Sequence, residues 1–258
     1  NGKGFRVGNT VRACTKGLWI WGKPIKHKDM SVVFMDTEGL GSPQQNMTTD
    51  VQIFSLALLL ASQFILNTQG TINEGSLEQL ELVVQCSQRI KVHDSSAKDN
   101  SLDALSKYFP KFLWVLRDFA LELVTQDGAA ITPKEYLEHV LSYQVDSDSQ
   151  TPRKKEKTRV RRSLSRAFTS RDCVTLIRPV DNEEDLQNLS GLSPAQLRPQ
   201  FLEEVAALRD KVFVGARPKQ IGSVAINGPG FLRLVEQYVQ ALNAGGIPTI
   251  HTAWSAVA

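Results

Sequence analysis

The sequence predicts an α/β domain with a mainly parallel sheet flanked by helices in three layers. Two observations predict this class. Short apolar runs, each closed by polar or turn residues, are typical of strands that are buried on both faces of a sheet. Longer segments with the 3.6-residue apolar repeat of helices lie between these runs. This alternation of strand and helix favours parallel strands joined by crossover connections.

The predicted strands are short, and a polar or turn residue follows most of them directly. They cover residues 18–21, 31–35, 63–66, 112–116 and 173–177. The first run contains Trp19 and Trp21, and we expect these side chains to lie in the core. The second run is rich in β-branched residues, and Asp36 follows it immediately.

The predicted helices occupy the segments between the strands. They cover residues 50–60, 77–90, 199–213 and 231–242, and one more begins at 132–135. Ser76 is a candidate N-cap for the second of them. Thr132, Pro133 and Glu135 have the order of a capping box with proline in the first turn. The polar stretches 92–102 and 144–158 are predicted to be loops.

The composition is that of a globular protein and says little about partners. The chain has 258 residues, 41% hydrophobic and 22% charged, with a net charge of +3. Its three cysteines, Cys14, Cys86 and Cys173, form no metal-binding pattern, which favours a reduced, intracellular setting. The longest apolar stretch, 53–66, is shorter than the roughly 20 residues that a membrane span needs. We therefore expect a buried helix followed by a strand there.

Asp36 follows a predicted strand and opens the motif Asp36-Thr37-Glu38-Gly39. In open α/β sheets, ligands bind at the carboxyl ends of strands. A nucleoside triphosphatase needs an aspartate there that accepts from a magnesium-bound water. It also needs a small glycine whose N–H can approach the γ-phosphate. By itself, D-x-x-G is more often a plain turn that ends a strand.

Thr15 lies on a loop about 21 residues before Asp36, just ahead of the strand predicted at 18–21. That strand can form a hairpin with the strand that ends at Asp36. A threonine in this position fits switch I, where its hydroxyl would bind Mg²⁺ and its backbone would meet the γ-phosphate. Taken alone, Thr15 is more often an ordinary loop hydroxyl, but together with D-x-x-G at this spacing the two interpretations are about equally favoured.

Arg117 and Asp118 follow the strand predicted at 112–116. A carboxylate at a strand end can accept from guanine N1–H and from the exocyclic amine. Adenine lacks that donor pair and would leave the carboxylate unpaired, so one aspartate can select the base. A surface salt bridge explains the pair locally just as well. The N-K-x-D motif that usually binds guanine is absent from the sequence.

Together these motifs resemble the guanylate-binding proteins and, more distantly, the atlastins, which are dynamin-related large GTPases. The resemblance covers nearly the whole chain and implies a Ras-like P-loop GTPase fold. It predicts that residues 1–258 form one partial GTPase domain. The matching blocks, in chain order, are Gly8-Asn9-Thr10, residues 15–21 (TKGLWIW), 36–40 (DTEGL), 53–57 (IFSLA) and 116–119 (LRDF).

The resemblance implies roles for individual residues. Thr15 would be the switch I magnesium ligand, and Asp36 would hold Mg²⁺ through water. Glu38 would support the catalytic water together with Thr15, and Gly39 would contact the γ-phosphate. The GTP-binding residues would be Gly39, Asp36, Arg117, Asp118, Arg178 and Pro179. The last two begin a guanine cap, residues 178–184, that would take part in nucleotide-dependent homodimerisation.

The sequence departs from the family pattern at two places. Ala13 stands where some members carry a serine that helps to position the attacking water. No G-x-x-x-x-G-K-[ST] motif occurs, although this loop supplies the amide cradle and the lysine for the β- and γ-phosphates. The family implies that the P-loop, an arginine finger and a first, central strand precede Asn1. We therefore predict that these 258 residues alone bind GTP poorly and do not hydrolyse it.

Two other functions compete with the GTPase interpretation. One is a nucleotide-free, degenerate GTPase fold that acts as an interaction module. The other is a nucleic-acid or membrane binder that uses the basic run 153–166. Val160, Leu164 and Phe168 follow a helical spacing in and just after that run, which favours an amphipathic helix with a solvated basic face. A nucleic-acid partner is not expected, and membrane contact would come from segments outside this chain.

Overall fold

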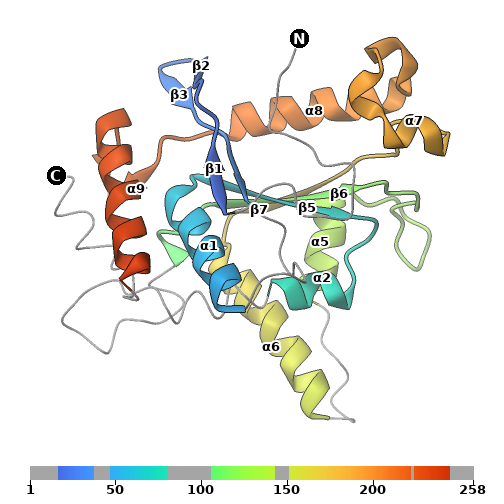
Figure 1. The fold of residues 1–258 in the computed structure, drawn as a ribbon. Helices are drawn as coiled ribbons and strands as arrows, with labels where there is room; N and C mark the ends of the chain where they lie inside the picture. The colour runs from blue at the N-terminus through green and yellow to red at the C-terminus, as the bar shows by residue number, and fades with distance from the viewer. Residues whose placement is uncertain (1–16, 38–46, 81–105, 143–150, 222–223, 245–258) are drawn as a thin grey trace.

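A three-stranded parallel sheet forms the centre of the computed structural model (Figure 1). It consists of β5 (Gln63–Gln69), β6 (Lys111–Arg117) and β7 (Arg171–Thr175), in that order. The structure describes residues 17–37, 47–80, 106–142, 151–221 and 224–244. The expected α/β class with parallel pairing is confirmed, and β5 extends three residues beyond the predicted strand end. β7 begins and ends two residues earlier than predicted.

Three short antiparallel pairs accompany the central sheet. They are β1 (Leu18–Ile20) with β4 (Met35–Thr37), β2 (Ile25–His27) with β3 (Met30–Val32), and β8 (Gln220–Ile221) with β9 (Val224–Ala225). The pairing of β1 with β4 confirms the expected hairpin. The single strand predicted at 31–35 is wrong, because β3 and β4 pair with different partners. The backbone changes partner at Val33 and Phe34.

The strand at β1 is confirmed, but the expectation that both its tryptophans lie in the core is wrong. Trp19 is 60% exposed, and Trp21 is half-buried. Within the described residues β1 pairs with β4 alone, so it is an edge strand there. Trp19 and Ile20 point to opposite faces of this three-residue strand and both are exposed, so neither face of β1 is fully covered by the described residues.

Seven α-helices are formed by the described residues, and most match predicted segments. They are α1 (Met47–Leu60), α2 (Glu74–Gln79), α5 (Pro133–Ser142), α6 (Pro152–Ala167), α7 (Glu183–Gln187), α8 (Pro199–Gly215) and α9 (Gly228–Asn243). The predicted capping box of α5 is confirmed. The Thr132 backbone N–H donates to Glu135 at 2.7 Å, and the Glu135 N–H donates to Thr132 Oγ1 at 3.2 Å.

The helix predicted at 77–90 begins earlier than expected. Its N-cap is Asn73, whose Oδ1 accepts from the Ser76 backbone N–H at 2.9 Å, so the assignment of Ser76 as the cap is wrong. Asparagine competes well with serine for this position, because a short side-chain acceptor is all that the free amides require. Residues 81–105 lie outside the described part of the chain, and so does the predicted loop 92–102.

Helices cover both faces of the sheet, as the sequence predicts. Figure 1 shows α8 on one side of the sheet and α2, α5 and α6 on the other. The alternation along β6 explains the two layers. Phe112, Trp114 and Leu116 face the larger core with α1, α5 and α6. Leu113 and Val115 face Leu176 and the apolar side chains of α8.

The basic run forms most of α6, which begins at Pro152 within the stretch predicted to be a loop. Val160, Leu164 and Phe168 are buried, so the predicted amphipathic helix is confirmed. One basic residue departs from the expected solvated face: Arg161 is only 6% exposed. Its guanidinium pairs with Glu74 of α2 and donates from Nε to the Val140 carbonyl of α5 at 3.1 Å.

The cysteine that the structure describes is not a reactive one. Cys173 lies on β7 as a free, buried thiol. Burial raises the pKa of the Cys173 thiol to about 12, so it stays protonated near neutral pH. Cys14 and Cys86 lie outside the described residues. In the parts of the chain that the structure describes, no helix is long and apolar enough to cross a membrane.

Candidate nucleotide site

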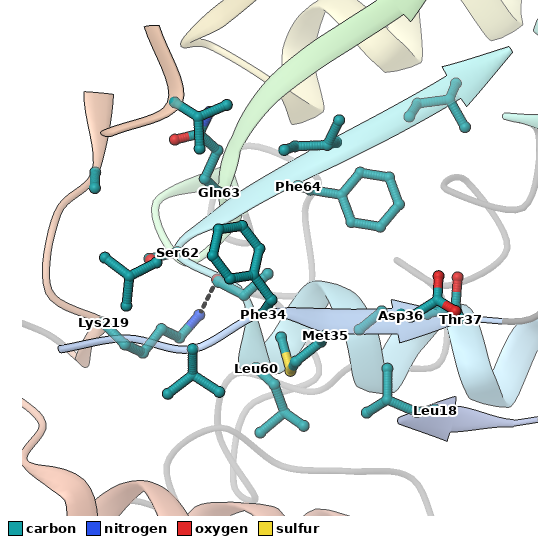
Figure 2. A pocket seen from close by; sticks show the side chains of 18 of the residues that line it. Leu18, Phe34, Met35, Asp36, Thr37, Leu60, Ser62, Gln63, Phe64 and Lys219 are labelled. Atoms are coloured by element: carbon teal, nitrogen blue, oxygen red, sulfur yellow. Dashed lines mark hydrogen bonds between the residues drawn. The ribbon is translucent and has the colours of Figure 1, made fainter. Parts of the chain in front are cut away.

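A pocket extends along the space between β4 and β5. Figure 2 shows the two strands running in the same direction, with Asp36 and Thr37 at one end of the pocket and Lys219 at the other. The middle is apolar. At the carboxyl ends of the strands the lining becomes polar, with Asp36, Thr37, Asn67, Thr68, Gln69 and Arg117. The sheet therefore gathers polar side chains where open α/β sheets bind ligands.

Asp36 occupies β4, opposite Trp19 of β1 in the antiparallel register. It is half-buried and lines the polar end of the pocket. The expected pairing of β1 with β4 therefore places the Asp36 carboxylate at the pocket. The other predicted phosphate and magnesium residues, Thr15, Glu38 and Gly39, lie outside the described residues.

Arg117 ends β6, and Asp118 follows it in a left-handed backbone conformation with φ of 53°. Both side chains bond to β5. Arg117 Nε donates to Asn67 Oδ1 at 2.7 Å, and Gln69 Nε2 donates to Asp118 Oδ2 at 2.8 Å. The two predicted guanine-binding residues are thus held from the neighbouring strand. Among the described residues both partners are neutral amides, so the contacts there are not those of a simple surface salt bridge.

Sequence reasoning missed Asn67 and Gln69 as functional candidates. The sequence predicts that the strand ends at Leu66, because the apolar run closes at the polar residue Asn67. The parallel ladder to β6 nevertheless continues to the pair Gln69 and Arg117. Polar residues at the carboxyl end of a buried strand were the available signal, and the rule that identified Asp36 applies to them as well.

Arg178 and Pro179 lie on the segment that leaves β7. Arg178 pairs with Glu183 at the start of α7, at 2.7 and 2.9 Å. The Pro179 carbonyl accepts from the Arg198 backbone N–H at 2.9 Å. These two predicted residues do not line the pocket that Asp36 and Arg117 share. The Phe119 N–H, which donates to the Leu176 carbonyl at 3.0 Å, ties the end of β6 to this segment.

Lys219 lines the opposite end of the pocket from Asp36. Its Nζ donates to the Ala61 carbonyl at 2.8 Å, just after α1 ends at Leu60 (Figure 2). Burial lowers the pKa of Lys219 to about 8. A cation near the last carbonyls of a helix also interacts favourably with the helix dipole. The contact therefore anchors the segment before α9 to the end of α1.

The donor set at the polar end fits a weakly protein-bound divalent cation. Among the described residues, no cluster of three or more His, Cys, Asp or Glu side chains occurs. Such a cluster would suit a metal held entirely by protein. Mg²⁺ instead keeps several waters and binds through one or two carboxylates plus substrate phosphates. One half-buried carboxylate, Asp36, at the mouth of a pocket is compatible with that mode.

Comparisons with known proteins agree on one family. A family model described as the N-terminal domain of guanylate-binding protein matches residues 1–220. Guanylate-binding protein 1 of Mus musculus is 37% identical over 256 residues, covering 97% of this chain and 42% of that protein. Guanylate-binding protein 2 of Homo sapiens is 36% identical over 261 residues, covering 99% of this chain and 43% of that protein. The chain thus spans about two fifths of the length of these relatives.

Proposed function

Since the chain belongs to the guanylate-binding protein family, we propose that it binds GTP at the carboxyl ends of β4, β5 and β6. We further propose that this domain hydrolyses GTP within the full-length protein. The observation that carries the proposal is the Arg117–Asp118 pair at the end of β6, held in place by two hydrogen bonds with side chains of β5. The relatives are named guanylate-binding proteins, which supports a guanine nucleotide as the ligand.

Base selection rests on Asp118 in this proposal. Its carboxylate accepts hydrogen bonds only, and guanine offers N1–H and the 2-amino group along one edge. Adenine presents an acceptor at N1 and would leave the carboxylate desolvated without partners, which costs about 1–3 kcal/mol or more. The stem of Arg117 would lie along the base, because its guanidinium is already directed toward Asn67.

Asp36 would hold the nucleotide's metal ion. Mg²⁺, when bound, would offset the negative charge of the β- and γ-phosphates. On the protein side, Asp36 would accept from a water of the ion, and Thr15 would be a direct ligand. Glu38 and Thr15 would orient the attacking water, and the Gly39 backbone N–H would contact the γ-phosphate.

The segment 178–184 would form the guanine cap. The Arg178–Glu183 ion pair and the bond from Arg198 to Pro179 give this segment a defined course after β7, with Pro179 and Val180 buried and residues 181–184 exposed. We propose that Arg178 and Pro179 cover the base and that the segment contacts a second copy of the protein in a nucleotide-dependent homodimer. The exposed acidic residues Glu183 and Glu184 would lie at that contact.

The 258 residues alone are proposed to bind GTP weakly and not to hydrolyse it, because they contain no G-x-x-x-x-G-K-[ST] motif. The competing proposal is a nucleotide-free GTPase fold that serves in assembly. Titration of the full-length protein with fluorescent GTP and ATP analogues separates the two. Saturable binding that prefers GTP by at least tenfold supports the GTPase proposal. No saturable binding to the full-length protein supports the assembly module.

A further inference from the structure

Two side chains of β5 hold the two predicted guanine-binding residues of β6. Asn67 Oδ1 accepts from Arg117 Nε at 2.7 Å, and Gln69 Nε2 donates to Asp118 Oδ2 at 2.8 Å. Both bonds link residues about 50 positions apart in the sequence, so they are tertiary contacts. Neither Asn67 nor Gln69 belongs to the motifs from which the nucleotide site was predicted.

The backbone conformation at Asp118 makes this arrangement possible. Asn67 and Gln69 are two positions apart on β5, so they lie on the same face of the strand. Their partners are consecutive residues, which would alternate between faces if β6 continued. β6 ends at Arg117, however, and Asp118 turns into the left-handed region with φ of 53°. Gln69 therefore reaches a carboxylate whose direction is set by a turn.

We propose that Gln69 is a positioning residue that fixes the Asp118 carboxylate in the orientation needed to bind the guanine edge at two points. This inference rests on the proposed function of Asp118. The Gln69 amide restricts rotation of the carboxyl group through Oδ2. A carboxylate has about four acceptor sites, so both of its oxygens can still accept from a base.

The chemistry of the base provides a specific consequence. Guanine donates from N1–H and from the 2-amino group, whereas hypoxanthine has the same N1–H but lacks the amine. A carboxylate held in one orientation gains from both donors. A carboxylate that is free to rotate can still accept the one bond from N1–H, but it accepts from N1–H and the 2-amino group together less readily. Removing Gln69 should therefore weaken binding of GTP more than binding of ITP.

Gln69 has little structural role that would confuse this test. Its side chain is exposed, and Gln69 belongs to neither of the described core clusters. Gln69→Ala should therefore leave the melting temperature nearly unchanged. Gln69→Glu keeps the size of the side chain but replaces the donor with a second carboxylate, so it should disturb Asp118 more strongly than the alanine variant.

The test measures dissociation constants for GTP and ITP with the full-length protein at constant salt concentration. For Gln69→Ala we expect GTP affinity to fall about tenfold, the scale of a hydrogen bond to a charged group reduced by exposure. ITP affinity should fall less than about threefold, so the GTP-to-ITP ratio drops. Gln69→Glu should lower the ratio at least as far. Gln237→Ala, an exposed glutamine on α9, is the matched control and should leave both affinities unchanged.

The outcomes separate this inference from the proposed function. If the unaltered protein prefers GTP over ITP and ATP, and Gln69→Ala and Gln69→Glu keep the same ratio, Gln69 does not position Asp118. An equal loss for both nucleotides also overturns the inference, because it indicates a general disturbance of the site. If the unaltered protein shows no preference for guanine, the proposed role of Asp118 fails first.

Discussion

Trp114 donates a hydrogen bond from its indole Nε1 to Thr68 Oγ1 at 2.8 Å. Trp114 is completely buried in the core, whereas Thr68 lies near the polar end of β5, between Asn67 and Gln69. The bond connects the core below the sheet to the strand end that holds Arg117 and Asp118. It also satisfies the one polar atom of a large buried side chain.

Replacing Thr68 should therefore destabilise the protein. Thr68→Val keeps the shape of the side chain but leaves the buried indole N–H without its acceptor, which costs about 1–3 kcal/mol. Chemical denaturation gives the free energy of unfolding. Thr169→Val, at an exposed position before β7, is the control and should change it by less than about 0.5 kcal/mol. Equal effects of the two changes would show that the indole bond contributes nothing.

Asparagine at position 118 should alter base preference. Asp118→Asn replaces one acceptor oxygen with an NH₂ donor, which opposes the guanine amine but matches the 2-oxo group of xanthine. Asparagine also tolerates the left-handed conformation, so the fold should be retained. We expect GTP affinity to fall by at least about tenfold and XTP affinity to rise, since a mispaired buried donor costs about 1–3 kcal/mol. Competition between the two nucleotides in the full-length protein measures this. Unaltered preference would refute the role of Asp118.

The buried arginine of α6 should matter more for stability than its exposed neighbour. Arg161 joins α6 to Glu74 of α2 and to the Val140 carbonyl of α5. Removing one partner of a largely buried pair is costly, so Arg161→Ala should lower the free energy of unfolding by about 2 kcal/mol, allowing for the partial exposure of Glu74. Arg162→Ala changes an exposed position and should have little effect. Similar losses for both variants would contradict this account.

The same ion pair has a dependence on pH. Burial raises the pKa of Glu74, but hydrogen bonds and charges from Arg161 and Lys157 outweigh it, and the pKa lies below its usual 4.5. A lowered carboxyl pKa stabilises the folded state above the unfolded value. This stabilisation disappears as pH falls through the folded value. Arg161→Ala should therefore flatten the acid limb of the stability curve below pH 4.5.

The burial of Lys219 predicts a second dependence of stability on pH, on the alkaline side of the curve. Burial lowers its pKa to about 8 from 10.5, so between these values the unfolded chain binds more protons than the folded one. The free energy of unfolding should therefore rise with pH, by about 1.5 kcal/mol from pH 8 to 9.5. Lys219→Met should remove most of that rise, whereas Lys134→Met, at an exposed position of α5, should keep it. A rise that persists without Lys219 must come from other groups.

The sequence predicts the central layers well because they depend on patterns that burial imposes. The apolar run before Arg117 and the helical spacing of Val160 and Leu164 both reflect contact with one core, and both predictions are confirmed. The predicted guanine-binding pair is placed at a strand end for the same reason. A local pattern does not determine which distant segment a strand pairs with or which side chain a residue contacts. The break at Phe34 and the burial of Arg161 depend on segments distant in the sequence.

The contacts from β5 illustrate the same limit at the site. Nothing near Asn67 or Gln69 in the sequence indicates Arg117 or Asp118, because only the parallel register of β5 and β6 brings them together. The local pattern even places the end of β5 at Leu66, three residues before the strand ends in the structure. The residues that hold a functional side chain are therefore harder to predict than the functional side chain itself.

The left-handed backbone conformation at Asp118 also restricts which amino acids fit this position without strain. Residues other than glycine, asparagine and aspartate adopt this conformation at a cost. Glycine would supply no side chain to the base, and asparagine would present a different hydrogen-bonding pattern. Backbone geometry thus favours three amino acids at position 118, of which one carries a negative charge. A single nucleotide substitution in the gene can convert the aspartate codon to either of the other two, so the carboxylate that we propose to select the base can be lost by one mutation without loss of the fold.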